Sequence, residues 1–189
     1  MPGPSFCKKI GRTVPCASPK EVLANPSETG PGRVDWSGWI PRERGTLCFV
    51  IRDEKILLIE KKRGLGAGKV NGPGGRIEPG ETAEQAAVRE TQEEIGITPH
   101  PIEWAGELHF QFRDGYSLHC SVYRAESWQG ELRETDEARP FWQEIRAIPY
   151  DRMWADDEHW MPRMLAGERF RGWFEFDGDQ MESARMERA

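Results

Sequence analysis

The strongest constraint on the fold is the segment Gly75–Ile97, in which a glycine-rich turn leads into one short helix. Thr82 is followed three residues later by Gln85, and this capping-box pattern predicts the start of a helix. Gly96 stands where a helix commonly ends in the left-handed conformation. We therefore expect a helix over Thr82–Ile95, and the rest of the fold must give this helix a surface to pack on.

The two sides of the expected helix differ in chemistry. At about 100° per residue, Glu90, Glu93 and Glu94 share one side. Like charges at this spacing repel by a few tenths of a kcal/mol per pair. A hard divalent cation such as Mg²⁺ prefers oxygen ligands and would relieve that repulsion. The neighbouring, less polar side should face a sheet and consists of Ala87, Val88, Thr91 and Ile95.

A solvated acidic face is the commoner origin of such a stripe. Arg89 favours the functional interpretation, because its guanidinium can hold one carboxylate in a fixed, bidentate geometry. The spacing of eight residues resembles the Nudix box, and these residues are Gly75, Glu81, Arg89, Glu90, Glu93, Glu94, Gly96 and Ile97. Thr91 departs from the box by occupying a position that is commonly aliphatic, but a small buried residue should serve there.

The resemblance to the Nudix family implies a fold and a chemistry. The implied fold is an α/β/α sandwich, of class α+β, with a mixed β-sheet. The implied reaction is hydrolysis, dependent on Mg²⁺ with Mn²⁺ as a substitute, of a nucleoside diphosphate linked to another group. By the same resemblance the metal ligands would be Glu90, Glu93 and Glu94 with a backbone carbonyl near Gly74 or Gly75, while Glu81 and Arg89 would support them.

The rest of the chain is read from alternating apolar patterns and turn signals. Strands outnumber helices, which fits an α+β class in which two helices cover the faces of a mixed sheet. A glycine-rich loop is expected over 61–75, and a second helix from Asp156-Asp157 to near Gly167. The expected strands are Thr46–Arg52 paired with Lys55–Glu60, Leu108–Phe112 paired with Tyr116–Val122 across Asp114-Gly115, Phe141–Ile145 and Arg171–Phe176.

Composition divides the chain into three parts. Residues 1–44 hold seven of the 14 prolines and little periodicity, so we expect an irregular extension there. Its end should pack on the body, because Trp36 and Trp39 are two large apolar side chains within four residues. Residues 45–178 would form the Nudix domain, and residues 179–189 a C-terminal tail.

Charge and hydropathy exclude several classes of function. The chain carries 26 basic and 32 acidic side chains, a net charge of −6, and a nucleic-acid polymer is an unsuitable partner for it. The longest apolar run, Leu47–Ile51, is far shorter than the roughly 18 residues of a membrane span. The four cysteines lack metal-site spacing, and no apolar leader follows the start. We expect a cytoplasmic monomer that binds a small nucleotide.

Residues outside the box bear on which nucleotide is bound. Asn71 could pair with a base edge, or simply form a turn with the glycine that follows. Asp156 and Asp157 could cap a helix; if both are desolvated in one pocket, one should keep a proton and become a donor. Trp154 offers a flat face for a base, whereas Trp160 fits core packing better. Glu137 lies in an acidic loop and would ordinarily be solvated.

From about Thr46 to Phe176 the chain resembles a narrower group, the MutT-type oxidised-purine nucleoside triphosphatases of the Nudix family. The stretches that carry this resemblance are 61–64, 66–68, 71–72, the box, 136–140, 153–154 and 156–157. It implies that Asn71, Asp156 and Asp157 read the purine edge and that Trp154 stacks on it. Glu137 would be an extra metal ligand or catalytic carboxylate, and the further substrate contacts would be Thr46, Lys61, Phe110 and Leu118.

The implied activity is hydrolysis of oxidised purine nucleotides such as 8-oxo-dGTP to the monophosphate and pyrophosphate, which clears the nucleotide pool. Glu93 is the favoured general base, with Glu94 and Glu137 as alternatives. Human members of the group have aromatic residues where this chain has Leu65, Val70 and Pro73. Two other functions stay open: a Nudix pyrophosphatase for ADP-ribose or a dinucleoside polyphosphate, and a nucleotide-binding domain without catalysis.

Overall fold

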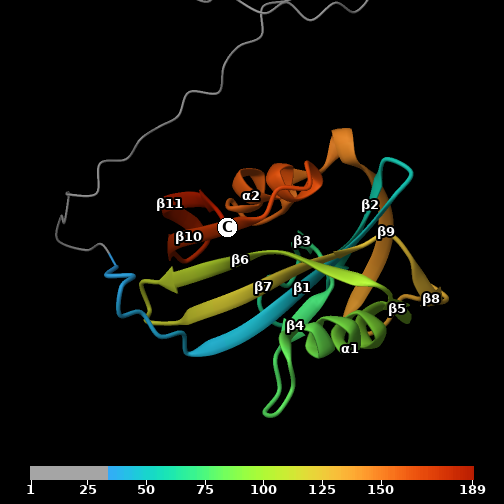
Figure 1. Cartoon of the computed structure of the whole chain (residues 1–189), viewed down its shortest axis with the longest axis horizontal. Coiled ribbons are helices and arrows are strands. Elements are labelled where there is room, and N and C mark those ends of the chain that lie inside the picture. Colours follow the sequence, from blue (N-terminus) through green and yellow to red (C-terminus); the bar gives the residue numbers. More distant parts are fainter. Residues whose placement is uncertain (1–33) are drawn as a thin grey trace, which may run out of the picture. The chain divides into compact units, whose positions relative to one another are not determined.

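The computed structural model describes residues 34–189, which form a nine-stranded mixed sheet with one helix on each side (Figure 1). The helices are α1 (Ala83–Ile95) and α2 (Asp157–Leu165). The strands are β1 (Glu43–Arg52), β2 (Lys55–Lys61), β3 (Val70–Asn71), β4 (Gly74–Arg76), β5 (Ile97–Pro99), β6 (Ile102–Phe112), β7 (Ser117–Ala125), β8 (Trp128–Gly130), β9 (Ala138–Glu144), β10 (Phe170–Asp177) and β11 (Gln180–Arg188). Two 3₁₀ turns, Ile145–Ala147 and Tyr150–Arg152, lead into α2.

The sheet runs in the order β11-β10-β6-β7-β1-β2-β3, with β4 paired to β1 and β9 paired to β2. The pairs β1/β7 and β6/β10 are parallel, and the other pairs are antiparallel. Strands β5 and β8 form a separate small sheet. The expected α+β class with a mixed sheet and two covering helices is therefore confirmed.

Both predicted hairpins are present. The β1–β2 turn places Asp53 and Glu54 at φ values of 51° and 59°, the left-handed backbone that a two-residue turn matched to the strand twist requires. The β6–β7 turn contains Gly115 at φ 87°. Strand β6 extends further toward the N-terminus than its alternation indicated, and begins at Ile102.

The structure corrects two expectations about irregular segments. Residues 180–188, expected to be a tail, form β11 and pair antiparallel with β10 along its whole length. Most β11 side chains are exposed, so its own sequence supplies little apolar signal, and it is ordered by backbone pairing with a strand that is well packed. The expected loop over 61–75 contains β3 and the start of β4.

The N-terminal boundary also differs. The compact unit begins at Val34, and the part of the expected extension that covers residues 1–33 lies outside the described residues. The structure places Trp36 and Trp39 on the outer surface of β6, half-buried, where the Trp39 indole donates to Gln111 Oε1 at 2.9 Å.

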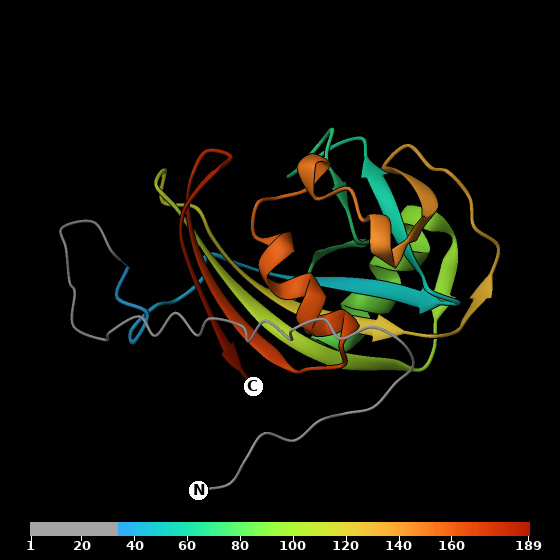
Figure 2. The same ribbon diagram turned by 90° about the horizontal axis from the view of Figure 1, so that it is seen from above.

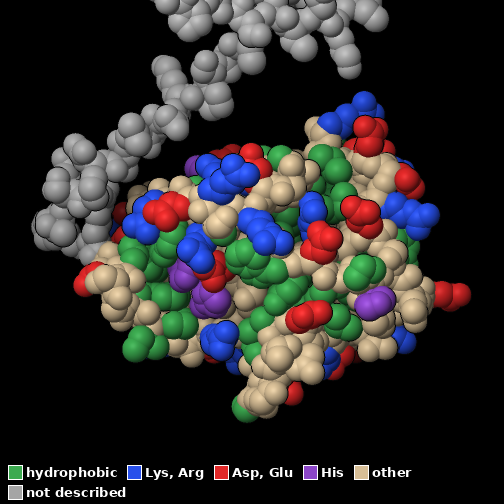
Figure 3. All heavy atoms as spheres, in the orientation of Figure 1, with side chains coloured by type: hydrophobic (Ala, Val, Ile, Leu, Met, Phe, Trp, Pro, Cys, Tyr) green, Lys and Arg blue, Asp and Glu red, His purple; other side chains and the backbone are tan. Residues whose placement is uncertain are grey.

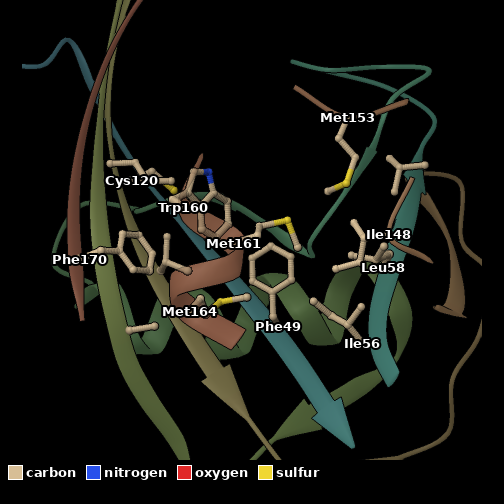
Figure 4. Close-up of a cluster of buried hydrophobic side chains, with 14 of the residues drawn as sticks. Phe49, Ile56, Leu58, Cys120, Ile148, Met153, Trp160, Met161, Met164 and Phe170 are labelled. Atoms are coloured by element: carbon tan, nitrogen blue, oxygen red, sulfur yellow. The ribbon is translucent and has the colours of Figure 1, made fainter. Parts of the chain in front are cut away.

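Each helix packs on its own apolar cluster. Trp160 of α2 is fully buried, stacks on Phe170 with ring centroids 5.5 Å apart, and meets Phe49 of β1 edge-on at 5.6 Å (Figure 4). The long strands curve, and α2 lies on their concave side (Figure 2). On the opposite side, Ala87 and Ile95 of α1 pack against β1, β2 and β7. Among the described residues, no helix is both long and apolar enough to cross a membrane.

Candidate active site

A cavity of about 550 Å³ is lined by the ends of β1, β6 and β7, the 61–65 loop and the start of α2. It gathers twelve of the fifteen predicted site residues: Thr46, Lys61, Asn71, Gly74, Glu90, Glu94, Phe110, Leu118, Glu137, Trp154, Asp156 and Asp157. The other three, Glu81, Arg89 and Glu93, do not line the cavity and lie beside it on α1 and its lead-in. Residues from distant parts of the sequence therefore meet around one space.

Helix α1 begins and ends as predicted, and this fixes the direction in which its acidic side points. The Thr82 side chain accepts from the backbone N–H of Gln85, whose own side chain accepts from the backbone N–H of Thr82. Gly96 ends the helix at φ 81°. The buried face differs from the expectation, because Ala86 and Glu94 belong to it whereas Val88 is only half-buried.

The three stripe glutamates sit at three different depths. Glu93 is exposed, Glu90 keeps 15% of its side-chain surface, and Glu94 keeps 1%. Burial is the largest influence on Glu90 and raises the pKa of its carboxyl, and repulsion from Glu94 and Glu93 acts in the same direction against the attraction of Arg89. A cluster that is half inside the protein therefore concentrates negative charge at the edge of the cavity.

Arg89 organises the exposed part of this cluster. Its Nε and Nη2 donate to the two oxygens of Glu81 at 2.9 Å each, a bidentate pair, and the hydrogen bond lowers the pKa of the Glu81 carboxyl. Its Nη1 donates to Glu90 Oε1 at 2.8 Å and to Glu93 Oε2 at 3.0 Å. One guanidinium thus holds three carboxylates in place, with a further bond to the carbonyl of Arg76 at 3.0 Å.

Glu94 is held from the opposite side. Lys61 Nζ donates to Glu94 Oε1 at 2.8 Å, and the backbone N–H of Gly74 donates to Oε2 at 2.9 Å. Buried carboxylates are tolerated when they are paired and hydrogen-bonded, and both conditions are met here. Lys61 therefore touches the carboxylate cluster directly as well as the cavity.

The backbone before α1 is shaped to the carboxylates. A Cβ at Gly75 would lie 2.4 Å from the Glu90 carboxylate, and one at Gly74 would lie 2.0 Å from the carbonyl oxygen of Thr46. A side chain at Gly75 would push the Glu90 carboxylate out of place, and one at Gly74 would push β4 away from the backbone of β1. Oxygen donors crowded at a cavity edge, with glycines making room for them, fit a hard divalent cation, and the residues that could hold it are Glu90, Glu93, Glu94 and Glu137.

The second acidic group, Asp156 and Asp157, lies deep in the cavity wall. Each residue is only 3% exposed. Neither side chain caps α2: Asp156 Oδ2 accepts from the Trp160 indole at 2.9 Å, and Asp157 Oδ2 accepts from the backbone N–H of Trp154 at 3.0 Å. The simple helix-cap interpretation of this pair is therefore wrong.

Burial changes the acidity of this pair. It raises the pKa of Asp156 to about 6 and the pKa of Asp157 well above its usual value, and the negative charge of Asp156 adds to the effect on Asp157. Lys69 opposes the rise at Asp157. Two neighbouring carboxyl groups in an apolar wall do not both ionise readily, because burial and mutual repulsion disfavour the second negative charge. With one carboxyl protonated, the pair offers one hydrogen-bond donor and one acceptor group to the cavity.

Aromatic and apolar side chains complete the wall around the aspartates. Trp154 meets Phe112 and Phe176 edge-on at 6.2 and 5.7 Å, and the Lys69 ammonium lies 4.7 Å from the centre of a Trp154 ring. Phe110 stacks on Phe174 at 5.6 Å. A cavity lined by aromatic rings in this way suits a planar aromatic ligand.

Two polar side chains line the same cavity and differ in how many of their hydrogen-bonding atoms already have partners. Thr46 Oγ1 is buried and has no hydrogen-bond partner within residues 34–189, so its hydroxyl is available to a ligand. Asn71 Oδ1 accepts from the backbone N–H of Gly72 at 2.7 Å, which is a turn contact, and the amide nitrogen of Asn71 remains as a donor. Asn71 therefore has the turn role and a cavity position together.

Glu137 lies at the outer edge of the cavity. Its side chain is 39% exposed and forms an ion pair with Arg63 of the 61–65 loop. The loop that carries Glu137 is tied to the body, because Thr135 Oγ1 donates to the backbone carbonyl of Glu94 at 2.7 Å. Of the three positions noted for their lack of an aromatic ring, Leu65 lines the cavity and is 49% exposed, whereas Val70 and Pro73 are buried away from it.

Sequence reasoning missed one polar group at the cavity mouth. Tyr116 Oη donates to Glu43 Oε2 at 2.8 Å, and Glu43 Oε1 pairs with Arg76 at 2.8 Å. Burial is the main cause that raises the pKa of Tyr116 to about 12. The first residue of β1 and the turn before β7 meet only because these strands are parallel neighbours, with Glu43 beside Leu118, and nothing local in the sequence signals that register.

The fold and this arrangement of residues define a Nudix hydrolase. The NUDIX domain matches residues 41–164, and the chain belongs to that family, whose members generally use divalent metal ions. It is 46% identical over 134 residues to the oxidized purine nucleoside triphosphate hydrolase of Danio rerio, covering 70% of this chain and 86% of that one. The protein of the same name from Mus musculus is 37% identical over 132 residues, covering 69% and 85%.

The structural comparison gives the same family. A crystal structure of a MutT protein from Bacillus halodurans superposes with a TM-score of 0.69 at 26% identity, covering 77% of this chain and 97% of that chain. The α/β/α sandwich expected from the Nudix box is thereby confirmed.

Proposed function

We propose that the protein hydrolyses oxidised purine nucleoside triphosphates, with 8-oxo-dGTP as the representative substrate, to the monophosphate and pyrophosphate. The two animal relatives, which this chain covers over at least 85% of their length, are both named oxidized purine nucleoside triphosphate hydrolase. The observation on which the proposal rests is the buried Asp156–Asp157 pair beside Trp154 within the cavity.

The aspartate pair suits a base whose hydrogen-bonding pattern has been altered by oxidation. Oxidation of a purine ring changes which ring positions donate and which accept. A carboxyl and a carboxylate that share one proton can present donor and acceptor in either order, whereas a fixed amide cannot. Asn71, which also lines the cavity, supplies a further amide donor.

The aromatic wall orients the base. Trp154 provides the largest flat surface beside the aspartates, and Phe110 and Leu118 close the wall formed by β6 and β7. Stacking on such side chains contributes roughly 1–3 kcal/mol per base in single-stranded nucleic-acid complexes, and a comparable contribution is expected here. Thr46, with its unpartnered hydroxyl, donates to or accepts from the nucleotide.

The phosphates then extend toward the carboxylate cluster. Glu90, Glu93, Glu94 and Glu137 would hold Mg²⁺, for which Mn²⁺ is a substitute, and the carbonyl near Gly74 would assist. When bound there, the metal neutralises phosphate oxygens and makes a water molecule more acidic. Arg89 and Glu81 keep the ligands in place, and Lys61 approaches the sugar or the phosphates.

We assign the general base to Glu93. Both oxygens of Glu94 are engaged, one by Lys61 and one by the Gly74 N–H, while Glu93 bonds to Arg89 through Oε2 and leaves Oε1 to solvent among the described residues. Glu93 can therefore accept the proton of the attacking water without breaking a contact that anchors the helix. Glu137 remains the alternative.

The decisive experiment is a substrate panel with Mg²⁺, comparing 8-oxo-dGTP, 2-hydroxy-dATP, normal dNTPs, ADP-ribose and a dinucleoside polyphosphate. We expect the highest kcat/KM for an oxidised purine triphosphate. Asp157→Asn should lower that kcat/KM about 5- to 150-fold, the effect of losing a buried hydrogen-bonding partner worth about 1–3 kcal/mol. Its matched control is Asp151→Asn, an exposed aspartate of the preceding 3₁₀ turn that does not line the cavity.

The outcomes separate the candidate functions. Fast turnover of ADP-ribose or a dinucleoside polyphosphate, unaffected by Asp157→Asn, would replace the purine-triphosphate proposal with the alternative pyrophosphatase. No turnover of any compound, combined with tight binding of nucleotides, would support a domain that binds without catalysis.

The setting proposed for this activity is the cytoplasm, and the active form proposed is a monomer. Cys48 and Cys120 are buried free thiols, as expected in a reducing compartment.

A further inference from the structure

The outer surface of the sheet, opposite the cavity, carries a second group of metal-binding side chains. Strand β6 alternates, so that Leu108 and Phe110 line the cavity while Glu107 and His109 point to the other side. His119 of β7 is the direct cross-strand neighbour of His109. Figure 3 shows histidine side chains gathered over this region of β6 and β7, among apolar and basic side chains.

We propose that Glu107, His109 and His119 form a second metal site, which binds Zn²⁺ with these three side chains and a water molecule. One ligand atom from each residue lies within 4.8 Å of the other two. Two imidazoles and one carboxylate form a donor set that zinc favours, whereas Mg²⁺ requires oxygen donors and belongs with the glutamates of α1.

The geometry is close to what zinc needs. With bonds of about 2.0–2.2 Å, neighbouring ligands of a tetrahedral zinc lie about 3.3 Å apart. Glu107 Oε2 and His119 Nε2 are already 3.1 Å apart. The rings of His109 and His119 are 4.9 Å apart at their centres, and one ligand atom of His109 already lies within 4.8 Å of the other two ligand atoms.

The surrounding contacts orient the ligands. His109 Nδ1 lies 3.0 Å from the carbonyl oxygen of Gly172 and donates to it, which leaves Nε2 as the atom with a lone pair. Arg171 Nε donates to Glu107 Oε1 at 2.6 Å, which turns the other carboxylate oxygen toward the histidines. Hydrogen bonds of this kind to the non-ligating atoms are a usual property of zinc sites.

Indole rings shelter the same three side chains. Trp173 stacks on His109 with an angle of 12° between the planes, and Trp39 meets His109 at 5.4 Å. The side chains of Glu107 and His119 keep only 24% and 16% of their surface. The site is therefore protected from bulk water but open enough to admit an ion with a water ligand.

The test is calorimetric titration of Zn²⁺ into the full chain after removal of metals, with excess Mg²⁺ present to occupy the carboxylates of α1. We expect one equivalent of bound zinc in the parent that is lost, or weakened at least about 10-fold, in His119→Gln and in Glu107→Gln. His100→Gln is the matched control, because His100 is exposed and is not a member of the cluster. It should bind as the parent does.

A second readout is independent of affinity. Co²⁺ bound by two imidazoles and a carboxylate in four-coordinate geometry gives visible ligand-field absorption, which should be absent from His119→Gln. Hydrolysis with Mg²⁺ should be the same in both variants as in the parent, and this shows that they are folded. Identical zinc isotherms for the parent and both variants would overturn the proposal, whatever substrate the cavity takes.

Discussion

The two acidic clusters at the cavity use the same functional group in opposite environments. The glutamates of α1 stand beside cations: Arg89 holds Glu90 and Glu93, and Lys61 holds Glu94. The aspartates at the start of α2 have an indole N–H and a backbone N–H as partners, and the charge of Lys69 acts on Asp157. The chemistry of a carboxylate in this protein is therefore decided by its neighbours.

The comparison explains how one cavity can bind two unlike parts of a nucleotide. Carboxylates that are hydrogen-bonded to Arg89 and Lys61 can exchange those cations for a metal ion. Carboxylates enclosed by apolar side chains retain a proton and act as hydrogen-bond donors as well as acceptors. Substitutions at Glu94, Asp156 and Lys69 test this difference between the two acidic clusters.

Removing one charge from the first cluster should abolish most of the activity. In Glu94→Gln the amide can still accept from the Gly74 N–H, but it no longer offers a charged metal ligand, and Lys61 loses its partner. We expect kcat to fall by at least about 100-fold, since metal catalysis contributes several kcal/mol. The measurement is steady-state hydrolysis over a range of Mg²⁺ concentrations, corrected for the folded fraction.

The matched control for that variant is Glu84→Gln, on the exposed first turn of the same helix. A Glu94→Gln protein that is folded and as active as Glu84→Gln would show that the buried glutamate is only structural.

Removing one charge from the second cluster should instead stabilise the fold at high pH. Since Asp156 has a pKa of about 6 in the folded protein against 3.8 ordinarily, the folded state holds more protons between these values. The free energy of unfolding therefore falls as pH rises through this window. Asp156→Asn does not titrate and should exceed the parent by about 1–3 kcal/mol at pH 8, with little difference at pH 4.

Urea unfolding of the parent and Asp156→Asn at both pH values measures this difference. An offset that is the same at pH 4 and pH 8 would contradict the origin assigned to it, because only a titrating group gives a pH-dependent offset. The same variant should bind the oxidised base more weakly, which would show stability and function in conflict at this position.

The smallest expected effect concerns the cation that reaches the second cluster. Lys69 lowers the pKa of Asp157, so Lys69→Met should raise that pKa and keep the pair protonated to higher pH. The alkaline decline of kcat/KM should move upward by a few tenths of a pH unit, because the interaction crosses a partly solvated space. Lys69→Arg retains the charge and should leave the decline where it is in the parent.

What was predictable from the sequence followed from local signals. Helix α1 is specified by Thr82, Gln85 and Gly96 within fifteen residues, and the hairpins by short turns between alternating segments. Strand β11 was missed because its residues are mostly polar and exposed, and it gains order only by pairing with β10. Local patterns therefore located the elements whose boundaries are set by neighbouring residues in the sequence.

The extent to which each site residue is buried could not be predicted from local sequence patterns. A helical projection places Glu93 and Glu94 on one side, but burial of Glu94 depends on Lys61 of β2 and Gly74 of β4 reaching over it. The contact of Tyr116 with Glu43 depends on the parallel register of β1 and β7. These properties come from tertiary neighbours, which the spacing of residues along the chain does not encode.

The ion pair between Lys61 and Glu94 has a practical consequence. It supplies an internal counter-charge for the most buried glutamate of α1, so we expect the fold to persist without an added ion. Protein treated with a chelator should therefore stay folded. Different metal ions can then be added to it one at a time and compared by the hydrolysis rates they support.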